Sequence, residues 1–158
     1  MHHLTTRTTV IEVGIMIYTP LTKKAIGLMF KLHKDQKDCS GLPYVFHPWH
    51  VAESMDDEIS TVVALLHDVV EDTDITFDDL RTEGFSDAII STLQLLTHDD
   101  SIPYMEYVAN LKHDPIARKV KLADLRHNSD LSRLDEITEK DRERYEKYQQ
   151  AIALLEAE

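Results

Sequence analysis

The sequence predicts an all-α fold, a compact single bundle of about seven or eight short helices. Its 158 residues fit one domain, and a hydrophobic content of 42% is enough to form one core. Only four glycines and five prolines interrupt the chain, which favours helices over β-architectures with many turns. Apolar residues recur at three- and four-residue steps along most of the chain, as buried helix faces require.

The N-terminal half contains two strong helix patterns. The first covers residues 19–36 and begins at Thr19-Pro20. Residues 38–48 hold one glycine and two prolines, so we expect a structured loop there, followed by a short helix from about Trp49. The second pattern runs from about Glu58 to Val70 and is apolar on nearly every side, which predicts the central core helix.

The C-terminal half predicts five further helices. Thr76 and Asp79 have capping-box spacing, and Gly84 is expected to end the helix that they begin. Ser86 begins the next helix, and Asp114-Pro115 supplies an N-cap and a first helical residue. The predicted ranges are 76–84, 86–96, 103–111, 115–128 and 138 to the C-terminus.

The first fifteen residues differ from the rest of the chain. They are threonine-rich and lack a helical pattern, whereas Met16 is followed closely by the first helix start. We interpret residues 1–15 as a leader or disordered extension, and residues 16–158 as the domain. His2 and His3 are accordingly not expected to be ligands.

Charge and composition exclude several classes of partner. With 17 basic and 29 acidic residues the net charge is −12, which argues against nucleic acid, whose binding needs clustered Lys and Arg. No stretch has the roughly 20 apolar residues of a membrane span. The single Cys39 cannot form an internal disulfide and indicates a reducing cytoplasm. An anionic substrate would need a local source of positive charge, and the oligomeric state is not predicted.

The most apolar predicted helix carries an unusual set of polar residues, His67, Asp68, Glu71 and Asp72. Carboxylates on a core helix are costly unless their charge is compensated, and a divalent cation is an economical compensation. His67 and Asp68 are adjacent, and Glu71 and Asp72 follow one turn later. The alternative is a helix end with solvated acids and a hydrogen-bonded core histidine.

Two other places in the chain favour the metal. Asp124 interrupts another apolar helix, with Asn128 four residues later on the same face. His47 lies in the loop between Pro43 and Pro48. Two imidazoles and two carboxylates suit Mn²⁺, Fe²⁺ or Zn²⁺, and this donor set does not choose among them.

Three segments, 46–48, 64–73 and 121–128, resemble the successive His, His-Asp and Asp motifs of the HD-domain hydrolases. They are most similar to the hydrolase domain of RelA/SpoT proteins and to the small stand-alone SpoT homologues. The resemblance covers about residues 19–155. It implies an all-helical fold with one Mn²⁺ that removes the 3′-pyrophosphate of (p)ppGpp.

The resemblance also implies roles for individual residues. It makes His47, His67, Asp68 and Asp124 the metal ligands and places Glu71 and Asp72 where relatives position and activate the attacking water. It places Asn128 at the nucleotide, with Ser40, Arg144 and Tyr148 as further contacts. A solvated helix face explains Arg144 equally well.

The sequence departs from this family at Asp38. The family stretch Gln-Arg-Arg-Lys-Ser-Gly aligns with residues 36–41, and its second Arg, which stacks on guanine, is Asp38 here. An Asp offers a base no planar cationic surface. Lys37, or Lys34 one turn earlier, is the candidate replacement for the lost charge.

Two alternative functions stay open. One is a phosphohydrolase or nucleotidase acting on another nucleotide, such as a 2′-phosphorylated dinucleotide. The other is a non-catalytic domain that senses a nucleotide, which the Glu71-Asp72 pair disfavours because a pure binder needs no water-activating carboxylate. The remaining residues near the motifs are interpreted as structural: Tyr44 and Trp49 as packing, and His33, His50, His98, His113 and His127 as surface or capping histidines.

Overall fold

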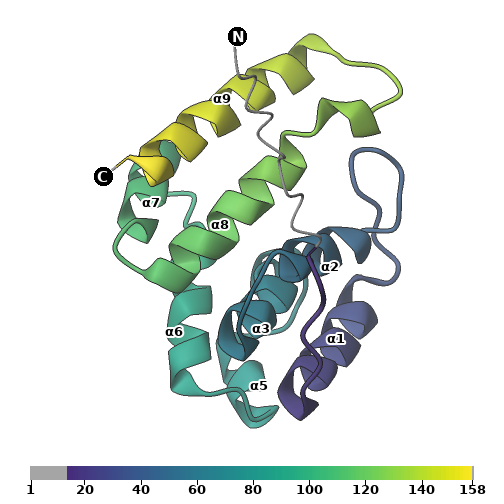
Figure 1. Cartoon of the computed structure of the whole chain (residues 1–158), viewed down its shortest axis with the longest axis vertical. Coiled ribbons are helices and arrows are strands. Elements are labelled where there is room, and N and C mark those ends of the chain that lie inside the picture. Colours follow the sequence, from purple (N-terminus) through teal and green to yellow (C-terminus); the bar gives the residue numbers. More distant parts are fainter. Residues whose placement is uncertain (1–13, 158) are drawn as a thin grey trace, which may run out of the picture.

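The computed structural model describes residues 14–157, and these form an all-helical domain, which confirms the predicted fold class (Figure 1). The predicted extension of residues 1–15, with His2 and His3, lies almost entirely outside the described residues. The N-terminal half comprises α1 (Pro20–His33), α2 (Phe46–Glu53), α3 (Glu58–Leu66), α4 (Val69–Asp72) and α5 (Phe77–Thr82). The C-terminal half comprises α6 (Asp87–Leu96), α7 (Tyr104–Leu111), α8 (Pro115–Asn128), the 3₁₀ turn η1 (Leu131–Arg133) and α9 (Glu139–Glu156).

The helix starts follow the predicted capping residues. Thr76 and Asp79 form the expected reciprocal capping box at α5, and Thr138 forms one with Asp141 at α9. Asp114 caps α8 by accepting a hydrogen bond from the backbone of Ala117. Gly84 follows α5 with a φ of +95°, a left-handed conformation that favours glycine.

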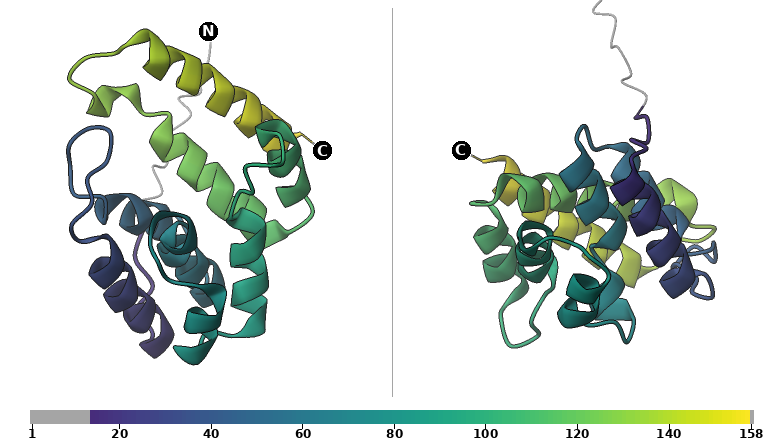
Figure 2. Two further views of the ribbon diagram at one scale, coloured as in Figure 1. Left: turned by 180° about the vertical axis from the view of Figure 1, so that it is seen from behind. Right: turned by 90° about the horizontal axis from the view of Figure 1, so that it is seen from below.

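The core forms around α3, which packs against α1, α2, α6 and α8 (Figures 1 and 2). Every residue from Ser60 to Leu66 is buried, as the apolar pattern predicted. One hydrophobic cluster extends from Met16 to Leu155, and α9 lies alongside α8 with the opposite chain direction. No helix within residues 14–157 has the length and apolar character needed to cross a bilayer.

Two of the helix boundaries that differ from the prediction concern the candidate site. α2 begins at Phe46, so His47 lies in the first turn of a helix and not in the preceding loop. The helix predicted for residues 58–70 is interrupted: His67 ends α3, and Asp68 precedes the one-turn α4. The interruption places His67 and Asp68 at the junction of two helices.

Candidate metal centre

The four predicted ligands come together from three separate parts of the fold. His47 is on α2, His67 and Asp68 join α3 to α4, and Asp124 is in the middle of α8. Ligand atoms of His47, His67 and Asp124 lie within 4.8 Å of one another, and all three residues are buried. Residues 77 positions apart thus form one polar cluster next to the core.

The break between α3 and α4 positions two of these side chains. Asp68 has φ −106° and ψ −1°, close to the bridge region in which many active-site residues lie. At this break the Asp68 carboxylate approaches the ring of the preceding histidine, and its Oδ2 lies 3.0 Å from His67 Nε2. Adjacent side chains of a continuous helix point about 100° apart, and the interruption lies where these two side chains approach each other.

The Nε2 atoms of His47 and His67 alternate with the carboxylates of Asp68 and Asp124 around a common point. His47 Nε2 lies 3.0 Å from Asp124 Oδ1 and 3.7 Å from Asp68 Oδ2. His67 Nε2 lies 3.6 Å from the same Asp124 oxygen. Despite these short distances, neither Nε2 makes a hydrogen bond, and both atoms are buried. Buried polar atoms are normally paired, so two unpaired nitrogens that face two carboxylates fit a bound cation.

Each histidine is held through its other ring nitrogen. His67 Nδ1 is 2.6 Å from the backbone carbonyl oxygen of Ala64, which can only accept, so this nitrogen carries the proton. His47 Nδ1 is 2.7 Å from His127 Nδ1 on α8. His127 was interpreted as a surface or capping histidine, and that interpretation was wrong because its ring lies against His47. The available signal was its position one turn after Asp124.

Asp124 is held by its own helix. Lys121 Nζ contacts Oδ2 at 2.8 Å, and Asn128 Nδ2 donates to Oδ1 at 2.7 Å. Burial opposes ionisation of Asp124, but Lys121 and the two neighbouring histidines hold its pKa well below the usual range. The same attraction raises the pKa of Lys121 despite burial of its ammonium group. Asp124 is therefore a carboxylate near neutral pH.

Asp68 is oriented by Tyr44, for which the sequence predicted only a packing role. The Tyr44 hydroxyl donates a hydrogen bond to Asp68 Oδ2. Burial of Tyr44 and the negative charge of Asp68 raise the pKa of the phenol, which therefore remains a donor. Tyr44 precedes His47 by three residues, so one segment supplies both a candidate ligand and a partner of another.

Glu71 and Asp72 follow on α4, beside the cluster. Glu71 Oε1 accepts a hydrogen bond from the backbone N–H of His98, which fixes the carboxylate and leaves the second oxygen free of that contact. Partial burial and the charge of Asp68 raise the pKa of both carboxyls. Both groups are therefore better proton acceptors than ordinary surface carboxylates.

The predicted nucleotide contacts are brought together only in part. Asn128 and Arg144 line one small cleft, together with Cys39 and Arg133. Tyr148 is half-buried one turn after Arg144 on α9, and the Lys147 ammonium lies 5.4 Å from the centre of its ring. Lys37 is exposed and pairs through its backbone with Pro43, while the Ser40 hydroxyl donates to Asp38.

Asp38, where the sequence departs from the RelA/SpoT pattern, is part of a hydrogen-bonded loop. Its Oδ1 accepts hydrogen bonds from the Ser40 hydroxyl and from the backbone N–H groups of Ser40 and Leu42. Its Oδ2 accepts one from Arg133 Nη1 at 3.0 Å. Both oxygens of the Asp38 carboxylate thus have hydrogen-bond partners within the protein.

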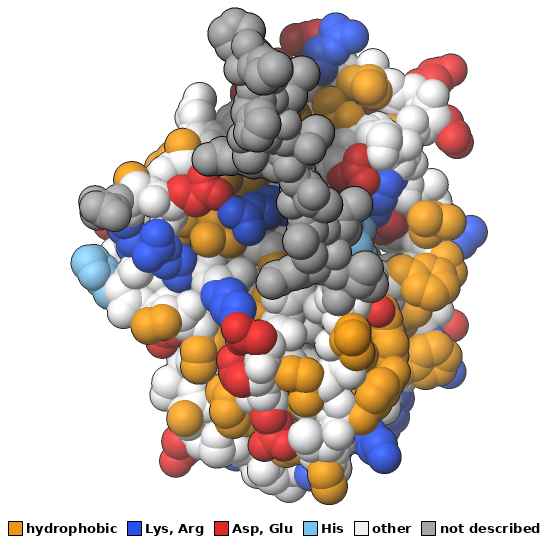
Figure 3. Space-filling model, in the orientation of Figure 1, with side chains coloured by type: hydrophobic (Ala, Val, Ile, Leu, Met, Phe, Trp, Pro, Cys, Tyr) orange, Lys and Arg blue, Asp and Glu red, His pale blue; other side chains and the backbone are white. Residues whose placement is uncertain are grey.

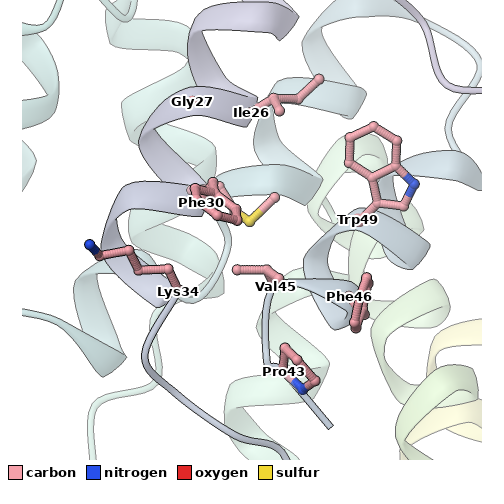
Figure 4. A pocket seen from close by; sticks show the side chains of 9 residues that line it. Ile26, Gly27, Phe30, Lys34, Pro43, Val45, Phe46 and Trp49 are labelled. Carbon is pink, nitrogen blue, oxygen red and sulfur yellow. The ribbon is translucent and has the colours of Figure 1, made fainter.

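A second cavity lies apart from the polar cluster. It has a volume of about 620 Å³ between α1 and α2, and its walls are mainly apolar, with Phe30, Val45 and Trp49 among them (Figure 4). Apolar side chains also gather on the part of the surface where α1 lies (Figure 3). Lys34 is at the edge of this cavity, and none of the four candidate ligands lines it.

Comparison with known proteins gives relatives that match most of this chain. It is 36% identical over 131 residues to the guanosine-3′,5′-bis(diphosphate) 3′-pyrophosphohydrolase MESH1 of Danio rerio, which covers 73% of this chain and 71% of the relative. The Homo sapiens protein of the same name is 38% identical over 124 residues, 70% of this chain and 69% of the relative. A GTP pyrophosphokinase of Streptomyces coelicolor is 33% identical, but the match covers only 14% of it. No family model matches.

The fold has a solved counterpart. The structure of a metazoan SpoT ortholog that hydrolyses ppGpp superimposes with a TM-score of 0.71 at 26% sequence identity. The match covers 90% of this chain and 89% of the other. The similarity therefore extends beyond the motifs to nearly the whole helical arrangement. This chain belongs to the family of guanosine-3′,5′-bis(diphosphate) 3′-pyrophosphohydrolases.

Proposed function

We propose that this chain hydrolyses the 3′-pyrophosphate of ppGpp, releasing GDP and pyrophosphate. The observation that carries the proposal is the pair of buried, unpaired imidazole nitrogens of His47 and His67 facing the carboxylates of Asp68 and Asp124. The relatives named for this reaction and the matching fold support it.

His47, His67, Asp68 and Asp124 are the proposed ligands of one divalent ion, with Mn²⁺ as the preferred identity. Mixed imidazole and carboxylate donors suit Mn²⁺, Fe²⁺ and Zn²⁺ alike, and the preference for Mn²⁺ comes from the resemblance to the RelA/SpoT hydrolases. When bound, such an ion lowers the pKa of a coordinated water and neutralises phosphate charge. It also supplies the local positive charge that a chain with a net charge of −12 otherwise lacks for an anionic substrate.

Glu71 and Asp72 are the proposed catalytic carboxylates. Water adds to the phosphorus attached to the ribose 3′ oxygen, and the bond between that phosphorus and the 3′ oxygen breaks. One carboxylate accepts the proton that the water loses, and the 3′ oxygen leaves with a proton as the hydroxyl of GDP. Glu71 is suited to this role because the His98 N–H orients it and its pKa is raised.

Asn128, Arg144 and Tyr148 are the proposed nucleotide contacts on α8 and α9. Asn128 also touches Asp124, so it links the nucleotide side of the site to the candidate ligands. Lys37 and Ser40 are further proposed contacts on the loop before α2, where Lys37 is exposed and available to a phosphate. The single cysteine, Cys39, is free and exposed, in keeping with the proposed cytoplasmic location.

One observation favours a second candidate substrate, a 3′-pyrophosphorylated nucleotide with a base other than guanine. Asp38 occupies the position of the guanine-stacking Arg, and its carboxylate accepts hydrogen bonds from Ser40, Leu42 and Arg133. Lys34, a possible replacement, lies at the apolar cavity between α1 and α2. Hydrolysis itself does not depend on the base, so the metal site and the catalytic carboxylates serve either substrate.

The proposal is tested by incubating the metal-free full chain with ppGpp and its adenosine counterpart, with and without added Mn²⁺. Products are separated by anion-exchange chromatography, with GDP and pyrophosphate expected in equal amounts only when Mn²⁺ is present. Asp124→Asn is the matched inactive variant, and His113→Gln, an exposed histidine, is the control for histidine replacement. Hydrolysis of the adenosine compound alone would establish the second candidate, and hydrolysis of neither would overturn the proposal.

A further inference from the structure

His127 contacts a candidate metal ligand without being one itself. Its Nδ1 lies 2.7 Å from His47 Nδ1, and the two rings meet edge to edge, with their centres 4.9 Å apart and their planes inclined by 30°. The His50 ring also contacts the His127 ring, and the centres of these two rings are 4.4 Å apart. His127 is three residues after Asp124 on α8, so one helix carries a candidate ligand and a partner of another ligand.

The contact requires one shared proton. Two imidazole nitrogens at this distance form a hydrogen bond only if one donates and the other offers its lone pair. A histidine that binds a metal through Nε2 must keep that nitrogen unprotonated. With a metal on Nε2, the His47 proton would therefore be on Nδ1, and His127 Nδ1 would accept the hydrogen bond from it.

We infer that His127 is a positioning residue, which accepts a hydrogen bond from the Nδ1–H of His47 and so directs the His47 Nε2 lone pair toward the metal. Partners of this kind normally are carboxylates, backbone carbonyls or water, and they fix both the tautomer and the ring orientation of the ligand. His67 has such an ordinary partner, the carbonyl of Ala64. The partner of His47 is the His127 side chain, so a mutation can remove the contact that orients the His47 ring.

The inference rests on the proposed metal site and is tested by metal affinity. Mn²⁺ binding to the metal-free full chain is measured by isothermal titration calorimetry for wild type, His127→Leu and His127→Asn. Leucine removes the acceptor, and its dissociation constant is expected to rise 10- to 100-fold. Asparagine places an oxygen near the position of Nδ1 and is expected to stay within about fivefold of wild type, whereas a steric role would give both variants the same loss.

Controls separate the possible failures. His113→Gln changes an exposed histidine and is expected to bind Mn²⁺ like wild type. Wild type that binds no Mn²⁺ would refute the metal site, whereas wild-type affinity in a folded His127→Leu would refute only the role of His127. A second measurement uses only the wild type and so does not depend on whether a variant folds: long-range ¹H–¹⁵N spectra of the Zn²⁺-loaded protein, which report the tautomer of each histidine. They are expected to show His47 protonated at Nδ1 and His127 at Nε2, and the reverse assignment would overturn the inference.

Discussion

Asp38 and Arg133 form an ion pair between segments 95 residues apart in the sequence. Arg133 Nη1 donates to Asp38 Oδ2 at 3.0 Å, and the two side chains are only 18% and 10% exposed. Arg133 Nη2 also donates to the carbonyl oxygen of His127 at the end of α8. The pair therefore joins the loop before α2 to the helix that carries Asp124.

Removal of this pair is expected to destabilise the fold. Asp38→Asn leaves the Arg133 guanidinium largely buried without its anion, and the free energy of unfolding should fall by about 1–3 kcal/mol. Urea unfolding followed by circular dichroism measures the change. Glu156→Gln removes the exposed pair with Arg126 and is the matched control, with an expected loss below about 1 kcal/mol. Equal small losses in both variants would contradict the prediction.

The contribution of Asp38 is expected to depend on pH. Burial acts to raise the pKa of Asp38, but the hydrogen bonds from Ser40 and Leu42 and the charge of Arg133 outweigh it and hold the pKa below its ordinary value of 3.8. A carboxyl with a lower pKa in the folded state stabilises that state above the unfolded-state pKa and loses this effect as the pH falls.

The stability difference between wild type and Asp38→Asn should thus stay constant from about pH 8 to pH 5 and shrink below about pH 4. Urea titrations of both proteins at pH 7, 5 and 3 provide the comparison, in which the other carboxyls are common to both and cancel. A difference that grows on acidification would show that the sign is wrong.

Lys121 is expected to matter more for stability than a surface lysine. It is only 16% exposed and contacts the buried Asp124, so Lys121→Met leaves a carboxylate without its compensating charge. The free energy of unfolding of the metal-free protein is expected to fall by about 3 kcal/mol. Lys119→Met, which removes the exposed pair with Asp56, is expected to cost less than about 1 kcal/mol. Similar losses in the two variants would contradict the assigned role of Lys121.

Glu71→Gln is expected to separate catalysis from metal binding. The amide cannot accept a proton, so turnover of ppGpp should fall by about 10²–10⁴-fold, while Mn²⁺ affinity stays near that of wild type. Product chromatography and calorimetry measure the two quantities on the same preparations. Glu106→Gln, an exposed glutamate on α7, is the control. A loss of Mn²⁺ affinity as large as that of Asp124→Asn would place Glu71 among the ligands.

Local sequence patterns were sufficient for most of the helices. Capping residues such as Thr76 and Asp114 satisfy the first backbone N–H groups of a helix through side chains a few residues away, so the sequence contains the whole interaction. The break at His67 could not be predicted in this way. Its apolar neighbours continue the helical pattern on both sides, and the advantage of interrupting it comes from side chains on α2 and α8.

By itself the sequence determined the helical class, most of the helix starts and the four candidate ligands, because periodicity, caps and local motifs depend on neighbouring residues. The tertiary structure decided the partners of two of those ligands, His127 for His47 and Tyr44 for Asp68, and it also decided the pairing of Asp38 with Arg133. These contacts join residues 24 to 95 positions apart. Their geometry depends on how α2, α3 and α8 pack around one core, which no local pattern encodes.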